Sequence, residues 1–216
     1  TETAMITRSN GVYFGITLTT GEFDGDGLPD ALAGDPGDAG HSGVYVVLDG
    51  AQLSAGCTFD ANSLPNIEEN DALSRIGVAA SQVGDSIAFT SVGPVTNSVY
   101  LLNGADVLSG SANTVNSGSV VVSGINYGGF GTALAGLDID ANGGIDLVIG
   151  APTANPGGQR EAGSVVAFSG GTLNSTGTTF DADDADIFIT GAAADEQVGG
   201  RLLGMGDLDN DGRPDL

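Results

Sequence analysis

The sequence predicts an all-β fold built from a unit that recurs about every sixty residues. Three segments share one order of motifs, and short runs of β-branched and aromatic residues within them are bounded by Gly, Asn, Ser and Asp. No segment carries a helical period sustained over about ten residues. These observations favour a repeat architecture of short strands over a single irregular core.

The repeated unit is clearest between residues 130 and 170. It begins with Phe-Gly at 130–131, continues with an Asp-rich loop at 136–146 and the apolar run Leu-Val-Ile-Gly-Ala-Pro at 147–152, and ends with Gly-Ser-Val-Val-Ala-Phe-Ser-Gly at 163–170. Segments 14–50 and 198–216 follow the same order. A weakened copy at 76–104 lacks the loop, because Gly84 and Asp85 lead directly into an apolar stretch. In this alignment Asp30, Asp85, Asp146 and Asp215 correspond.

Each unit is expected to contain about four short strands, which is the size of a β-propeller blade. The clearest expected strands are 44–48, 99–102, 120–122, 165–168 and 187–189. The Gly-Asp-Pro at 34–36 and Gly-Ala-Pro at 150–152 are expected to end strands, because Pro resists continuation of a ladder.

We therefore expect residues 1–216 to form one partial propeller of about three to four blades. Its predicted parts are the last strand of a preceding blade (1–10), a blade with an Asp-rich loop (11–70), a degenerate blade without one (71–123), a blade with a loop (124–191) and the start of a further blade (192–216). These units are too few to close a ring, so the rest of a longer propeller or a second chain is expected to complete it.

Composition restricts the partners. The chain has 28 acidic residues against 5 Arg and no Lys, and its net charge is −23. This charge argues against nucleic acid, whose phosphates require Lys and Arg, and against attachment to anionic membranes. No apolar run approaches the roughly 18 residues of a membrane span. Such a charge strains a compact fold unless the acids are dispersed or hold cations.

The Asp-rich loops follow the pattern Asp-x-Asp/Asn-x-Asp/Asn-Gly-x-x-Asp, which suits calcium. Calcium takes six to eight oxygen ligands at about 2.3–2.6 Å, and alternate side chains of a tight loop supply several of them. Gly at position 6 permits the sharp turn, position 7 offers its carbonyl oxygen and position 9 a carboxylate. The predicted ligands are Glu22, Asp24, Asp26, Leu28 and Asp30 in loop one, Asp138, Asp140, Asn142, Gly144 and Asp146 in loop two, and Asp207, Asp209, Asp211, Arg213 and Asp215 in loop three.

Two to three calcium ions are therefore expected. The three loops contain 4, 3 and 4 acidic residues, so 11 of the 28 acids of the chain lie in them. An EF-hand begins with a similar pattern, but it requires a Glu at position 12 and flanking helices. Position 12 is Ala33 in loop one and Ile149 in loop two, and the flanks are predicted strands. Asp-Gly clusters also form simple turns, yet three matches in register with a repeat favour metal binding.

The combined motif resembles the FG-GAP repeat of integrin α-subunit β-propellers and their bacterial relatives. Residues 130–170 match best, 14–50 and 198–216 match well, and 76–104 departs by lacking the loop. The resemblance implies a propeller, usually seven-bladed, with calcium in loops joining the first two strands of a blade. It also implies an extracellular or cell-surface setting and a role in adhesion or in binding a protein or glycan ligand, usually at the face opposite the calcium loops.

The sequence shows no catalytic constellation, so we expect a binding module rather than an enzyme. The chain has one histidine, His41, and no Gly-x-Ser-x-Gly motif. The acidic run 181–186 is read as a solvated turn, with a weak cation site as the alternative. The alternative function is that of a propeller in a secreted hydrolase or lyase acting on polysaccharide or phospholipid.

Overall fold

The fold is described from a computed structural model over residues 5–8, 13–37, 43–53, 58–68, 75–93, 97–111, 114–115, 120–124, 127–173 and 177–216. His41 lies outside these residues. Strands dominate, and the helices are single turns: α1 (Gly50–Leu53), α2 (Gly104–Leu108) and the 3-10 turns η1 (Ala61–Ser63), η2 (Pro156–Gly158) and η3 (Ala182–Asp184). In this part of the chain, no helix has the length and apolar character needed to cross a membrane.

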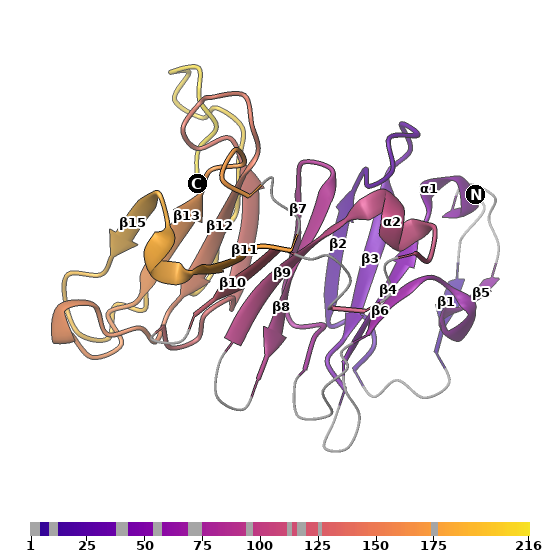
Figure 1. Cartoon of the computed structure of the whole chain (residues 1–216), viewed down its shortest axis with the longest axis horizontal. Coiled ribbons are helices and arrows are strands. Elements are labelled where there is room, and N and C mark those ends of the chain that lie inside the picture. Colours follow the sequence, from indigo (N-terminus) through magenta and orange to yellow (C-terminus); the bar gives the residue numbers. More distant parts are fainter. Residues whose placement is uncertain are drawn as a thin grey trace.

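Three antiparallel sheets stand side by side like successive propeller blades (Figure 1). The first blade has the order β2 (Thr17–Gly21), β3 (Asp30–Asp35), β4 (Val44–Leu48), β6 (Asn66–Glu68). The second has β7 (Ala80–Val83), β8 (Ser86–Val92), β9 (Asn97–Asn103), β10 (Val120–Ser123). The third has β11 (Ala133–Leu137), β12 (Asp146–Ala151), β13 (Ser164–Phe168), β15 (Ile187–Thr190). The predicted all-β fold of four-stranded, propeller-type blades is thus confirmed.

The hydrophobic core lies between the blades. Every residue of β4 and of β13 is buried, because these strands have a covered sheet face on both sides. One cluster joins the first and second blades through Leu32, Tyr45 and Phe89. A second cluster joins the second and third blades through Val99 and Phe168. A third covers the far face of the third blade with residues from the segment after β15.

Each blade also reaches back to the outer strand of the blade before it. β5 (Thr58–Asp60) pairs in parallel with β1 (Met5–Thr7), and β14 (Thr179–Asp181) pairs in parallel with β10. In the second blade the same contact is reduced to a parallel bridge between Thr114 and Glu68. The position of β1 is therefore equivalent to that of β10, the outermost strand of a blade.

Each unit begins with a pair that ends in Gly: Phe14-Gly15, Ile76-Gly77, Phe130-Gly131 and Val198-Gly199. At Gly77, Gly131 and Gly199 this glycine lies close to the preceding blade, whereas nothing lies within 4 Å of a Cβ at Gly15. The second residue of each pair has a left-handed backbone, with φ of 85° at Gly15, 101° at Gly77, 77° at Gly131 and 87° at Gly199. A Cβ on Gly199 would lie 3.0 Å from the Cα of Gly150 in the preceding blade. Gly150 and the equivalent Gly34 lie inside their strands, which end one residue later, immediately before Pro. Only Gly combines this φ with this spacing.

The register of the second blade differs by one residue from the sequence alignment. Asp30 and Asp146 pair with the last residue of the first strand of their blades, and the residue in that place in the second blade is Ser86. Asp85 belongs instead to the two-residue turn between β7 and β8. The alignment placed it one position too late because the shortened turn leaves no loop residues to fix the offset.

Candidate metal centre

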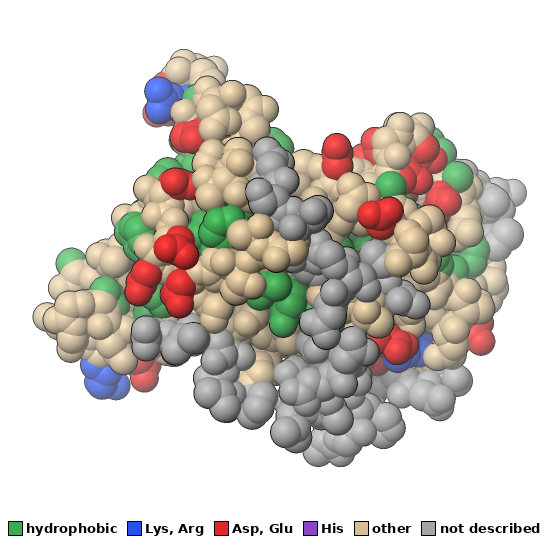
Figure 2. Space-filling model, viewed as in Figure 1, with side chains coloured by type: hydrophobic (Ala, Val, Ile, Leu, Met, Phe, Trp, Pro, Cys, Tyr) green, Lys and Arg blue, Asp and Glu red, His purple; other side chains and the backbone are tan. Residues whose placement is uncertain are grey.

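The Asp-rich loops lie at one edge of the blades. Loop one joins β2 to β3, loop two joins β11 to β12, and loop three follows the segment that covers the third blade. All three project from the upper edge in Figure 1. Acidic side chains gather along the same edge in Figure 2. The repeat therefore places loops of one type in equivalent positions on the first and third blades, and a third such loop after the third blade; the second blade has only a short turn there.

In each loop, three carboxylates converge. Positions 1, 3 and 9 supply oxygens that all lie within 4.8 Å of one another: Glu22, Asp24 and Asp30; Asp138, Asp140 and Asp146; Asp207, Asp209 and Asp215. Like charges at such distances repel, so a divalent cation between them is favourable. Exposed acidic groups also occur without a metal, and the threefold recurrence of the same positions is what distinguishes this arrangement.

The three loops share the same backbone conformation at positions 4 and 6. Positions 4 and 6 are left-handed in each, with φ of 84° and 83° at Gly25 and Gly27, 58° and 88° at Ala141 and Gly143, and 63° and 89° at Asn210 and Gly212. The sequence predicted the Gly at position 6. It did not predict the turn at position 4, because Gly, Ala and Asn share no obvious signature.

Position 1 anchors the loop through backbone amides. In loop two, the carboxylate of Asp138 accepts hydrogen bonds from the amides of Asn142 and Gly143, both at 2.9 Å. In loop three, Asp207 accepts from Asp211 and Gly212 at 3.0 and 2.8 Å. The two loops are therefore nearly superimposable in their hydrogen bonding.

Loop one departs from this pattern at its longer first residue. Glu22 accepts from Asp24 and Gly25 at 3.3 and 2.6 Å, two positions earlier in the loop than the donors to Asp138 and Asp207. The extra methylene moves the carboxylate toward the start of the loop. Its oxygen still joins the convergent group of three carboxylates.

Position 9 connects the loop to the body of the blade. Asp30 and Asp146 are 1% and 0% exposed, at the first residue of β3 and of β12. Asp30 accepts from Phe23 at 2.7 Å and from Gly50 at 2.8 Å, and Asp146 accepts from Ile139 and Gly170 at 2.8 and 2.9 Å.

Burial and the neighbouring negative charges both disfavour the ionised carboxylate of Asp30. Burial raises the pKa of its carboxyl above the ordinary value, and the charges of Asp24 and Asp49 add to this, whereas the amides of Phe23 and Gly50 lower it. A bound cation would offset both unfavourable contributions.

The side chain at position 5 hydrogen-bonds to the backbone of its own loop. The side chains of Asp26, Asn142 and Asp211 each accept a hydrogen bond from the amide of position 7 (Leu28, Gly144 and Arg213) at 2.7, 2.7 and 2.9 Å. The convergent carboxylate groups do not include Asp26 or Asp211. A side-chain oxygen has further lone pairs, so these residues and the position 7 carbonyls stay predicted ligands.

The second blade replaces the loop with a backbone contact. Gly104 is its counterpart of Gly50 and Gly170, since each follows the third strand of a blade. Its amide donates to the backbone carbonyl of Asp85 at 2.9 Å, whereas the other two donate to the carboxylates of Asp30 and Asp146. The blade therefore keeps the hydrogen bond after losing the carboxylate.

The acidic run 181–186 has a structural role. Asp181 and Asp184 form a capping box at η3: the Asp181 carboxylate accepts from the backbone inside the turn, and the Asp184 carboxylate accepts from the amide of Asp181. Asp186 accepts from the amide of Ser169 at 2.8 Å. No convergent acidic group forms here among the described residues. This favours the reading of a solvated, capped turn.

Comparison with known proteins supports the resemblance to integrin α-subunits. No family model matches the chain. The chain is 27% identical over 168 residues to integrin alpha-5 of Xenopus laevis, a match covering 73% of this chain and 15% of that protein. The chain thus spans a small part of this relative. A solved structure of the Dos1 propeller covers 74% of this chain and 32% of its own, with 10% identity and a TM-score of 0.41.

Proposed function

We propose that this chain is part of an extracellular β-propeller that binds calcium in its Asp-rich loops and uses the metal to stabilise a surface for protein or glycan ligands. The observation that carries the proposal is the recurrence of one donor arrangement in three loops, with carboxylates from positions 1, 3 and 9 within 4.8 Å. The similarity to integrin alpha-5, together with the resemblance of the repeat to the FG-GAP family, supports the extracellular setting.

The metal's proposed role is structural. Loops one and two close the first hairpin of their blades, and the last carboxylate of each is also tied to the end of the next hairpin through Gly50 or Gly170. A cation held there would join two hairpins and neutralise three converging charges. Because it binds only the folded loop, it would raise the stability of the whole blade by mass action.

Calcium titration calorimetry on protein stripped of metal tests this proposal. We expect about three calcium sites in the wild type, with dissociation constants in the range usual for extracellular calcium-binding modules. The double substitution Asp138→Asn and Asp140→Asn should remove one site. The control Asp183→Asn and Asp184→Asn changes two acids of the capped turn and should leave the number of sites unchanged. Equal stoichiometry in both variants, or no heat of binding, would overturn the assignment.

A further inference from the structure

Loops one and two each place their second residue in a core next to their blade. Phe23 of loop one is 2% exposed and belongs to the core between the first and second blades. Ile139 of loop two packs into the core on the far side of the third blade. The core between the second and third blades contains no such residue among the described ones, because the second blade has only the turn of Gly84 and Asp85.

The missing residue leaves a cavity. Phe23 covers Gly104 of the second blade so closely that a Cβ on Gly104 would lie 2.7 Å from the Cβ of Phe23. The counterpart of Gly104 in the third blade is Gly170, and it lines an open cleft of about 670 Å³ between the two blades. This volume lies within the range of about 300–1,000 Å³ that is usual for ligand pockets.

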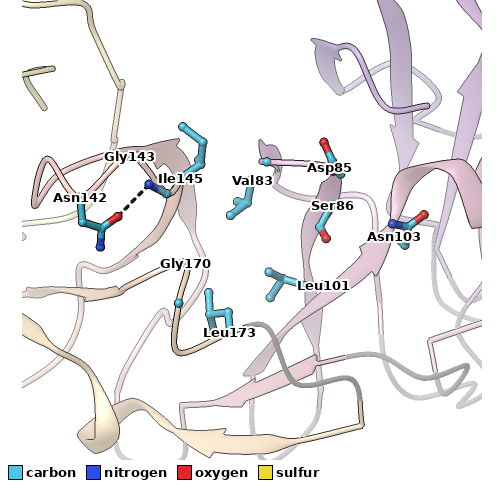
Figure 3. A pocket seen from close by; sticks show the side chains of 13 residues that line it. Val83, Asp85, Ser86, Leu101, Asn103, Asn142, Gly143, Ile145, Gly170 and Leu173 are labelled. Carbon is cyan, nitrogen blue, oxygen red and sulfur yellow. Dashed lines mark hydrogen bonds between the residues drawn. The ribbon is translucent and has the colours of Figure 1, made fainter. Parts of the chain in front are cut away.

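The cleft has an apolar floor and a polar rim. Val83, Leu101 and Leu173 are 6%, 7% and 7% exposed, and Figure 3 shows them between the loop of Asn142 and the turn of Asp85. Asp85 is exposed, and its carboxylate makes no hydrogen bond or ion pair with another described residue. The lining contains neither Lys nor Arg and no aromatic ring. An aliphatic stem fits this floor, and a cation fits this rim.

We propose that this cleft binds a lysine or arginine side chain of a protein partner, with the stem on Val83, Leu101 and Leu173 and the cation at Asp85. The net charge of −23 favours approach of such a partner. The site lies at the edge that carries the Asp-rich loops, not at the opposite edge where the family resemblance places the ligand. The inference rests on the proposed binding role but not on the metal.

The first test compares two labelled peptides by fluorescence anisotropy at low ionic strength with saturating calcium. One carries a single arginine between Gly and Ser residues, and the other carries citrulline, which has the same shape without the charge. The arginine peptide should bind at least about fivefold more tightly, and added salt should reduce the difference. Equal binding of both peptides, or binding of neither, would overturn the proposal.

Two matched pairs of variants locate the site. Gly171 lines the cleft, and a Cβ there would meet only Ser169 Oγ at 3.9 Å, so Gly171→Phe should fill the cleft and abolish binding. Gly206→Phe is the control, because nothing lies within 4 Å of a Cβ at that position. Asp85→Asn should weaken binding about two- to fivefold, whereas Asp106→Asn on α2 should not.

The outcomes separate this inference from the proposed function. If calcium raises the melting temperature but Gly171→Phe and Gly206→Phe bind the arginine peptide equally, the cleft is not the site and the metal proposal stands. If Gly171→Phe abolishes peptide binding in a protein that shows no calcium response, the cleft stands and the metal role is wrong. Binding of a neutral oligosaccharide in place of the peptide, lost in Gly171→Phe, would contradict the cationic ligand.

Discussion

The buried carboxylate of Asp146 accepts a hydrogen bond of 2.9 Å from the backbone amide of Gly170, which lies 24 residues further along the chain. The other oxygen accepts from Ile139 inside the loop. One side chain thus fixes both the Asp-rich loop and the end of the next hairpin. Asp30 does the same with Phe23 and Gly50 in the first blade.

Asp146→Ala should therefore destabilise the protein even without metal. It leaves the amides of Ile139 and Gly170 without their acceptor, and an unsatisfied buried group costs about 1–3 kcal/mol, so we expect a loss of about 2–6 kcal/mol. Urea denaturation in the presence of a chelator measures it. The control Asp140→Ala removes an exposed carboxylate of the same loop and should cost clearly less. Equal losses in the two variants would contradict the structural role of Asp146.

Phe23→Ala should open the core between the first and second blades. The ring is 2% exposed and packs in one cluster with Tyr45 and Val107. Truncation of a buried Phe typically costs about 3–5 kcal/mol. Leu208 holds the same position in loop three but is 63% exposed, so Leu208→Ala should change the unfolding free energy by less than about 0.5 kcal/mol. A small effect at Phe23 would show that the loop does not take part in the core.

The fold could be predicted largely because its signals are local. The apolar run 44–48 matches β4, and 165–168 falls within β13, since strands buried on both faces read as continuous apolar runs. The convergence of positions 1, 3 and 9 also follows from loop spacing alone. What could not be predicted depends on contacts between distant residues: the bond from Gly170 to Asp146 requires the register of two strands.

The strands that reach back between blades do carry a signal in the sequence. The parallel strands β5 and β14 share the tetrapeptide Thr-Phe-Asp-Ala, at 58–61 and 179–182, followed in each case by a 3-10 turn. This second repeat marks the segment that reaches back to the preceding blade. The cleft at Gly170 had no sequence signal of its own, because it results from the absence of a loop in the neighbouring blade.

Tyr127 should make stability sensitive to alkaline pH. Burial, together with the hydrogen bond of 2.7 Å to Asp183 and that residue's charge, raises the pKa of Tyr127 to about 12. The unfolded chain loses this proton near pH 10, so the stabilisation is present below about pH 10 and is lost as pH rises toward 12. Urea denaturation between pH 8 and 11 should show a steeper loss in the wild type than in Tyr127→Phe.

An alkaline slope that is the same in the wild type and in Tyr127→Phe would show that the Tyr127–Asp183 contact does not hold the proton of the phenol in solution.

The most direct test of the account is the melting temperature in calcium, in magnesium and in chelator at matched ionic strength, since a net charge of −23 responds to any added salt. One site at 100 times its Kd adds about 2.7 kcal/mol, and a chain of this size gains about 2–4 °C per kcal/mol. We predict a rise of at least about 5 °C that is specific to calcium and smaller in the double variant Asp138→Asn and Asp140→Asn. A melting temperature that is the same in all three solutions would contradict the claim that the loops hold calcium.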